Sequence, residues 1–162
     1  MHYMKIVMDA DCLIKLTKAG LKELVCKAFA VSIPRRVKEE VVDSGRAKDL
    51  PDALIIDGNI TRGLIQVRET AGVKRGAGEK AALALYQTGG YDAIGSDDKQ
   101  FIRSLRMFGI PYVTPATCLA TMYRRDLLEG SDALKYLDEL AAHISEAEYH
   151  TVKLFIEKGR SS

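Results

Sequence analysis

The chain has 162 residues, of which 47% are hydrophobic and 28% are charged, and its formal net charge is +2. This length predicts one domain over residues 1–162 with a sizeable core, ending in helices from about residue 115. The small net charge excludes binding to nucleic acid through overall basicity and leaves only local patches for it. Three widely spaced cysteines argue for buried thiols in a reducing compartment. No signal peptide or membrane-spanning stretch is recognisable, so we expect a cytoplasmic protein without membrane contact.

The predicted elements alternate between short apolar strands and amphipathic helices. Strands are expected at residues 5–8, 30–33, 64–67, 92–96 and 110–113. Helices are expected at 11–29 with a break near Gly20, then at 35–44, 51–64, 79–89 and 97–109, with later starts at Thr114, Ser131 and Ser145. Strands separated by helices predict an α/β fold of three layers, in which a five-stranded parallel sheet lies between two layers of helices. The site of such a fold lies beyond the carboxyl ends of the strands.

Two acids follow the first predicted strand. Residues 5–8 end abruptly at Asp9, and Asp11 opens the apolar series that comes next. Aspartate is a favoured N-cap residue, and we assign that role to Asp11. Asp9 is then left without a structural task, which makes it a candidate functional acid at the edge of the sheet.

A similar pair, Asp97 and Asp98, follows the fourth predicted strand. The buried stripe of the next helix is defined by Phe101, Leu105 and Phe108, and Asp98 projects close to the centre of that stripe. We therefore assign Asp97 as the helix cap and Asp98 as a second functional acid.

Two glutamates occupy comparable positions on other helices. Glu40 borders the face formed by Val37 and Val41, whereas Glu39 points almost the opposite way. A solvated, charged helix is the structural alternative for Glu40. Glu79 lies in the first turn of its helix, where a favourable interaction with the helix dipole is an alternative explanation.

Asp9, Glu40, Glu79 and Asp98 follow or flank different strands at one end of the predicted sheet. Four carboxylates in one cleft repel each other, and without a counter-charge some of them stay protonated. A hard divalent cation such as Mg²⁺ or Mn²⁺ resolves this conflict because it takes oxygen ligands and retains several waters. Since such an ion activates water for attack on phosphorus, the sequence predicts a metal-dependent phosphate-ester hydrolase.

Four segments carry a resemblance to a known family: IVMDADCLI, IPRRVKEEVV, GAGEKAALAL and IGSDDKQF. In this order they resemble a PIN-domain nuclease, of the group that includes VapC-like toxin ribonucleases. The resemblance runs from about Lys5 to Thr114. The third acid is Glu79 in a Gly-Glu motif, whereas many toxins carry an Asp further into that helix, which indicates a subgroup.

The resemblance implies a Mg²⁺- or Mn²⁺-dependent endoribonuclease that cleaves RNA phosphodiester bonds with a metal-activated water. It assigns catalysis and metal binding to Asp9, Glu40, Glu79 and Asp98, with Asp97 as a further metal ligand and Ser96 in a supporting role. It also implies a homodimer and a possible role as the toxin of a toxin–antitoxin pair, with an antitoxin protein as partner.

The basic residues near Glu79 are Lys74, Arg75 and Lys80, which we expect to hold substrate phosphates. Two alternatives remain. A haloacid-dehalogenase-like phosphatase shares the Asp-x-Asp after the first strand, but it has Thr or Val where this chain has Leu13. A catalytically inactive PIN fold could act as an interaction module, although none of the four acids is missing.

Overall fold

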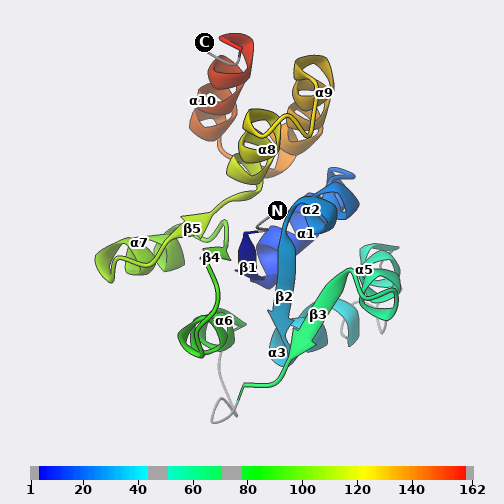
Figure 1. The fold of residues 1–162 in the computed structure, drawn as a ribbon, viewed down its shortest axis with the longest axis vertical. Helices are drawn as coiled ribbons and strands as arrows, with labels where there is room; N and C mark the ends of the chain where they lie inside the picture. Colours follow the sequence, from blue (N-terminus) through cyan, green and yellow to red (C-terminus); the bar gives the residue numbers. More distant parts are fainter. Residues whose placement is uncertain (1–3, 44–50, 71–77, 160–162) are drawn as a thin grey trace.

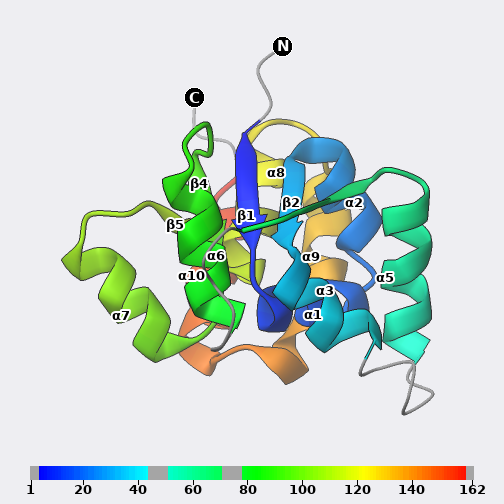
Figure 2. The same ribbon diagram turned by 90° about the horizontal axis from the view of Figure 1, so that it is seen from below.

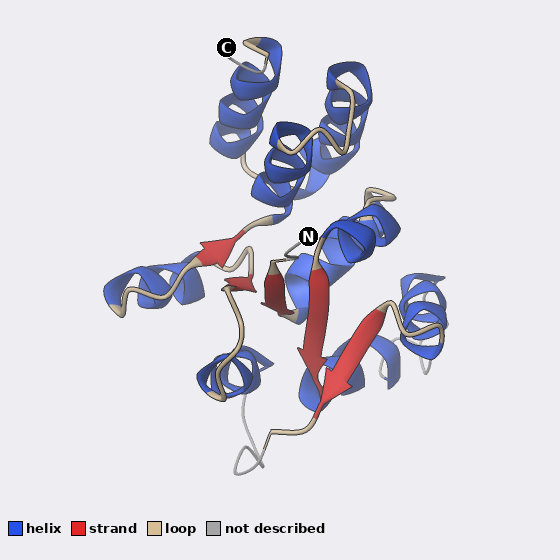
Figure 3. Ribbon diagram, viewed as in Figure 1, coloured by secondary structure: helices blue, strands red, loops and turns tan. Residues whose placement is uncertain are grey.

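The structure is a computed structural model that describes residues 4–43, 51–70 and 78–159. Its centre is a sheet of five parallel strands in the order β3-β2-β1-β4-β5 (Figures 1 and 3). The strands are β1 (Lys5–Met8), β2 (Ala30–Pro34), β3 (Ile65–Arg68), β4 (Ala93–Gly95) and β5 (Tyr112–Val113). The predicted α/β fold with a five-stranded parallel sheet is confirmed.

The helices connect these strands and continue after the last one. They are α1 (Ala10–Lys18), α2 (Lys22–Ala28), α3 (Arg35–Lys38), the π-helix η1 (Glu39–Asp43), α5 (Pro51–Thr61), α6 (Gly78–Gln87), α7 (Lys99–Met107), α8 (Pro115–Arg124), α9 (Gly130–Leu140), the 3₁₀-helix η2 (Ala141–His143) and α10 (Glu146–Glu157). The last three α-helices pack on one another as a layer beyond β5 (Figure 1).

The alternation of buried side chains along the strands divides the core between the two faces of the sheet. Val7 of β1 packs with side chains of α6, and Ile94 of β4 packs with side chains of α7. Ile6, Met8 and Ile33 point to the opposite face, where α1, α2 and α8–α10 contribute to the larger part of the core. The three expected layers therefore arise from strands that are apolar on both faces.

Three local predictions are wrong. Phe108 does not belong to the buried stripe of α7, because it is the C-cap residue, it is 73% exposed, and Gly109 turns the chain away with a φ of 67°. Ser131 does not open α9, which begins at Gly130 after an N-cap position at Glu129. The helix after Pro34 is α-helical for only four residues and continues as η1, whose wider turn buries Val41 and Val42 side by side.

Two further observations bear on the expectations from composition. Cys12, Cys26 and Cys118 are all free thiols, and the first and last of them are buried. Among the helices that the structure describes, none has both the length and the apolar character needed to cross a bilayer.

Candidate functional site

Strand order reverses between β1 and β4, and the predicted acids gather at this point. The chain runs outward from β1 through β2 to β3 and then returns to place β4 on the other side of β1. In open α/β sheets, ligands bind beyond the carboxyl ends of the strands at such a reversal. Asp9 directly follows β1 and Ser96 directly follows β4, and the Asp9 N–H donates to the Gly95 carbonyl at 2.9 Å. Figure 2 shows α1 and α3 at this end of the strands.

Asp9 is the N-cap of α1, and its carboxylate is 4% exposed. Its Oδ1 accepts a hydrogen bond from the Cys12 N–H at 2.9 Å, and its Oδ2 accepts one from the Ser96 hydroxyl. The assignment of Asp11 as the cap is wrong, because α1 begins at Ala10 with no spacer after β1. Asp11 is exposed in the first turn and pairs with Lys15 at 3.2 Å.

Burial raises the pKa of Asp9 from its ordinary value of 3.8 to about 6. The hydrogen bonds from Ser96 and Cys12 act in the opposite direction, because they stabilise the charged form. The negative charges of Asp11 and Glu79 add to the effect of burial. Asp9 is thus a carboxyl group that is held in a fixed orientation and is costly to ionise without a nearby cation.

Asp98 takes the corresponding position after β4. It is the N-cap of α7, with its Oδ1 accepting from the Phe101 N–H at 2.8 Å. Its own N–H donates to the Ser96 hydroxyl oxygen at 3.2 Å. Ser96 is completely buried, and its hydroxyl links the two acids because it donates to the Asp9 carboxylate and accepts from the Asp98 N–H. The assignment of Asp97 as the cap is wrong, because the first turn of α7 begins one residue later than the apolar pattern indicated.

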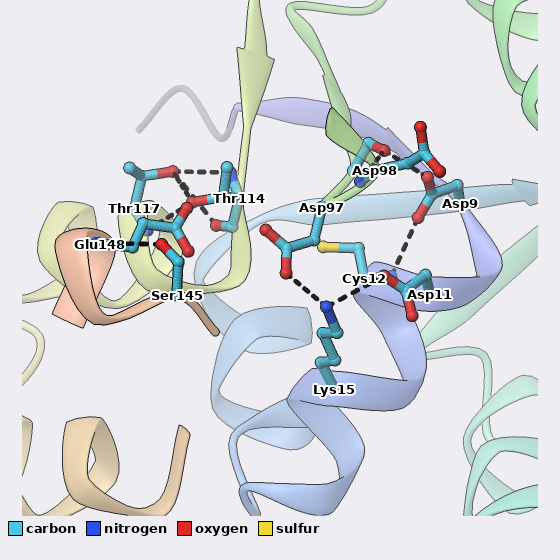
Figure 4. Close-up of polar contacts among 11 residues, drawn as sticks. Asp9, Asp11, Cys12, Lys15, Asp97, Asp98, Thr114, Thr117, Ser145 and Glu148 are labelled. Carbon is cyan, nitrogen blue, oxygen red and sulfur yellow. Dashed lines mark hydrogen bonds and ion pairs between the residues drawn. The ribbon is translucent and has the colours of Figure 1, made fainter. Parts of the chain in front are cut away.

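Asp97 is directed away from the other acids. Its carboxylate forms a salt bridge with Lys15 of α1, which also pairs with Asp11 (Figure 4). Burial raises the pKa of Asp97, while the hydrogen bond from Lys15 opposes that rise. The structure therefore does not bring Asp97 together with the four catalytic candidates, although it was predicted as a fifth metal ligand.

Glu79 joins the acids from the first turn of α6. Its side chain is half-buried, and burial is the main cause that raises its pKa. The negative charges of Asp98 and Glu40 and a hydrogen bond between the Glu79 and Asp98 carboxyl groups raise it further. Glu79 is therefore the acid whose charge interacts with Asp98 and Glu40 and, more weakly, with Asp9.

Glu40 reaches the same place from η1. A Cβ atom on Gly78 would lie 3.1 Å from each carboxylate oxygen of Glu40, so this carboxylate lies against the start of α6. Both glutamates also pair with the exposed Arg36, Glu39 at 3.5 Å and Glu40 at 4.0 Å. The two side chains differ little in exposure, with 39% for Glu40 and 47% for Glu39. The position against Gly78, and not burial or the pair with Arg36, distinguishes Glu40 from Glu39.

The structure thus brings Asp9, Glu40, Glu79 and Asp98 together, and we call this group the acidic site. All of its charged groups are carboxylates, which are the oxygen donors that Mg²⁺ and Mn²⁺ prefer. Their mutual repulsion, seen in the raised pKa of Glu79, gives a divalent cation a favourable place. Within residues 4–43, 51–70 and 78–159, no three His, Cys, Asp or Glu side chains are arranged to hold a metal ion as they stand. The donor set fits such an ion, whereas its ligand geometry is not preformed.

Of the predicted phosphate-binding residues, Lys80 is exposed in the first turn of α6. Lys74 and Arg75 lie outside the described residues. Two positions near the acidic site had no role in the sequence analysis. Gly78 leaves room for the Glu40 carboxylate, and Lys15 holds Asp97. The Gly-Glu pair at the start of a helix is a signal for the first, but the partner of Lys15 is 82 residues away and leaves no local signal.

The parallel sheet with acids at its strand reversal defines the chain as an α/β protein with a cluster of carboxylates beyond the strand ends. A family model described as a PIN domain matches residues 5–157. The chain therefore belongs to the PIN-domain family, whose members are typically nucleases that use divalent metals. A comparison with curated proteins finds no match.

Proposed function

We propose that this protein is a Mg²⁺- or Mn²⁺-dependent endoribonuclease and that the acidic site is its active site. The observation that carries the proposal is the convergence of four acids from different segments of the chain. Ser96 joins Asp9 to Asp98, Glu40 lies against the start of α6, and the charge of Glu79 in α6 interacts with those of Asp98 and Glu40. A structural role explains each acid singly. It does not explain why four like charges share one location beyond the reversal of the sheet.

In this proposal Asp9, Glu79, Asp98 and Glu40 hold the ion through carboxylate oxygens. When bound, Mg²⁺ or Mn²⁺ supplies Lewis-acid chemistry that makes water more acidic and offsets charge on phosphoryl oxygens. Ser96 and the Cys12 N–H each fix one oxygen of Asp9, so this carboxylate does not rotate freely. Because Asp9 must lose its proton to offer full charge, cation affinity should rise as the pH passes about 6.

RNA is the proposed substrate because the motifs around the four acids resemble those of PIN-domain ribonucleases. The same resemblance suggests a homodimer and a toxin role with an antitoxin partner. The free cysteines suggest a cytoplasmic setting. The match to the PIN-domain family favours this interpretation over a haloacid-dehalogenase-like phosphatase. The experiment below distinguishes the ribonuclease from a catalytically inactive interaction module.

The test compares wild type with Asp9→Asn on several labelled single-stranded RNAs, with Mn²⁺, with Mg²⁺ and with EDTA. Asp11→Asn is the matched control, since it makes the same chemical change on an exposed residue two positions away. We expect metal-dependent cleavage that Asp9→Asn abolishes and Asp11→Asn retains. Hydrolysis of a chromogenic phosphate monoester without RNA cleavage would support the phosphatase. The inactive fold would be supported if calorimetry detects no Mn²⁺ binding and the labelled RNAs are not cleaved.

A further inference from the structure

A pocket of about 670 Å³ lies beside the acidic site, and we call it the α7 pocket. Its walls come from α7, from β5 and from the starts of α8 and α10. Asp97 lines it, and the next residue, Asp98, belongs to the acidic site. Figure 4 shows Thr114, Thr117, Ser145 and Glu148 gathered on one side of Asp97, and Asp98 with Asp9 on the other. Adjacent residues of the β4–α7 connection therefore belong to the two locations, Asp97 to the α7 pocket and Asp98 to the acidic site.

One wall of the α7 pocket is a row of cations. Lys99, Arg103 and Arg106 are spaced by four and three residues, which places them on one face of α7 over a rise of about 10 Å. All three are exposed and line the pocket. Arg106 is oriented by Tyr112, whose hydroxyl accepts from its Nε at 2.8 Å and whose ring centroid lies 5.5 Å from the guanidinium carbon. In the described part of the chain, no hydrogen bond or ion pair holds the side chain of Arg103.

The two acids of the pocket are already engaged at its inner end. Asp97 forms its salt bridge with Lys15. Glu148 is half-buried in the first turn of α10, where Thr114 stabilises its charged form and so opposes the rise in pKa that burial causes. Both helix starts at this end are also capped, because Thr114 accepts from the Thr117 N–H and Ser145 from the Glu148 N–H. Four cationic and two anionic side chains line the pocket, so the outer wall on α7 carries the excess positive charge.

We infer that Lys99, Arg103 and Arg106 bind backbone phosphates of the RNA strand next to the bond placed at the acidic site. This inference rests on the proposed function. It adds that the RNA strand runs along α7. Row spacing along one helix face suits a repeating phosphate backbone, and such contacts position a strand without reading its sequence. An acidic protein segment is the competing occupant. The pocket residue Asp97 directly precedes Asp98 of the acidic site, and this short separation along the chain favours the nucleic acid.

The test measures binding and not cleavage. The reference protein and the variants all carry Asp9→Asn, which prevents cleavage, and are kept in EDTA. The probe is a fluorescein-labelled mixed-sequence RNA of about 12 nucleotides, and its binding is followed by fluorescence anisotropy. The test variant is Lys99→Gln/Arg103→Gln, which leaves the Arg106–Tyr112 contact intact. The matched control is Arg124→Gln/Arg125→Gln, an equal loss of charge at exposed positions outside the α7 pocket.

Each phosphate contact on a single strand contributes about 0.7 to the slope of log affinity against log salt, or about 5-fold in affinity near 0.1 M salt. The test variant should therefore bind about 25-fold more weakly and lose about 1.4 from the slope. The control should change neither. Circular dichroism and melting curves verify that both variants fold, and the single change Arg103→Glu replaces the test variant if it does not fold.

Equal RNA binding by the test and control variants would overturn the inference, even if wild type cleaves RNA. Binding that depends on α7 together with no cleavage by wild type would support the inference and count against the proposed function alone. Oligoglutamate that binds with the same dependence on Lys99 and Arg103, while RNA does not bind, would overturn the inference in favour of a protein partner.

Discussion

Asp9→Asn should stabilise the metal-free protein, and the gain should depend on pH. Folding raises the pKa of Asp9 from 3.8 to about 6, so the folded state binds its proton more tightly than the unfolded state. The resulting stability is complete below about pH 3.8 and is lost as the pH rises to about 6. A shift of about 2 units at 1.36 kcal/mol per unit gives about 3 kcal/mol. Asn has no charge to desolvate, and it can still cap α1.

The assay is urea unfolding in EDTA at about pH 4 and about pH 8, where the first condition leaves Asp9 protonated in the folded state and the second ionises it. The gain of Asp9→Asn over wild type should be larger at the higher pH by up to about 3 kcal/mol. Asp11→Asn is the control, because Asp11 is exposed and its pair with Lys15 should contribute less than about 1 kcal/mol at either pH.

Parallel pH profiles for wild type and Asp9→Asn would refute this reasoning, because they would mean that Asp9 titrates alike in the folded and unfolded states. A loss of stability at both pH values would mean instead that the hydrogen bond from Ser96 requires a carboxylate. In that case Asp9 would be structural even without metal.

Three further perturbations address the rest of the acidic site. Asp98→Asn should leave metal-free stability equal or higher because Asn still caps α7, whereas Asp98→Ala should lose about 1 kcal/mol of stability. Melting curves test both variants. Wild type should melt at a higher temperature when Mn²⁺ is added. Glu40→Gln should lower the RNA cleavage rate by about 10-fold or more, while Glu39→Gln should change the rate little and stability by less than about 0.5 kcal/mol; greater damage from Glu39→Gln would contradict the contacts seen at Gly78. Gly78→Ala should weaken Mn²⁺ binding, because the new methyl group would lie 3.1 Å from both Glu40 carboxylate oxygens and push them aside; unchanged calorimetric affinity would argue against Glu40 as a metal ligand.

The sequence was sufficient to predict the parallel sheet and to select the four acids as candidates. Alternating strands and helices fix a parallel topology, and a polar residue directly after an apolar strand must lie at the edge of the sheet. Asp9 and Asp98 could be chosen on this basis, whereas Glu40 was chosen from its helical phase and Glu79 from its place in the first turn of a helix. Their proximity to one another depends on the order β3-β2-β1-β4-β5, which no local pattern encodes.

The division of labour within each acid pair was not predictable. In Asp9-Ala10-Asp11 either acid can cap a helix, and the choice depends on how tightly the chain turns after β1. The periodicity of α7 gave the direction of Asp98 but not the residue at which the helix begins. The same limitation applies to η1, because an α-helical phase of 100° per residue cannot anticipate a π-turn.

The double use of Asp9 and Asp98, as helix caps and as members of the acidic site, constrains how descendants of this chain can diverge. A lineage released from selection for cleavage still needs a side-chain oxygen at both positions to start α1 and α7. Asn, Ser and Thr meet that need, whereas aliphatic residues do not. Lineages that have lost cleavage should therefore accumulate Asn or Ser at positions 9 and 98, while Glu40 and Glu79, which cap no helix, vary without such restriction. That substitution pattern would identify a homologue that has lost catalytic activity and kept the fold.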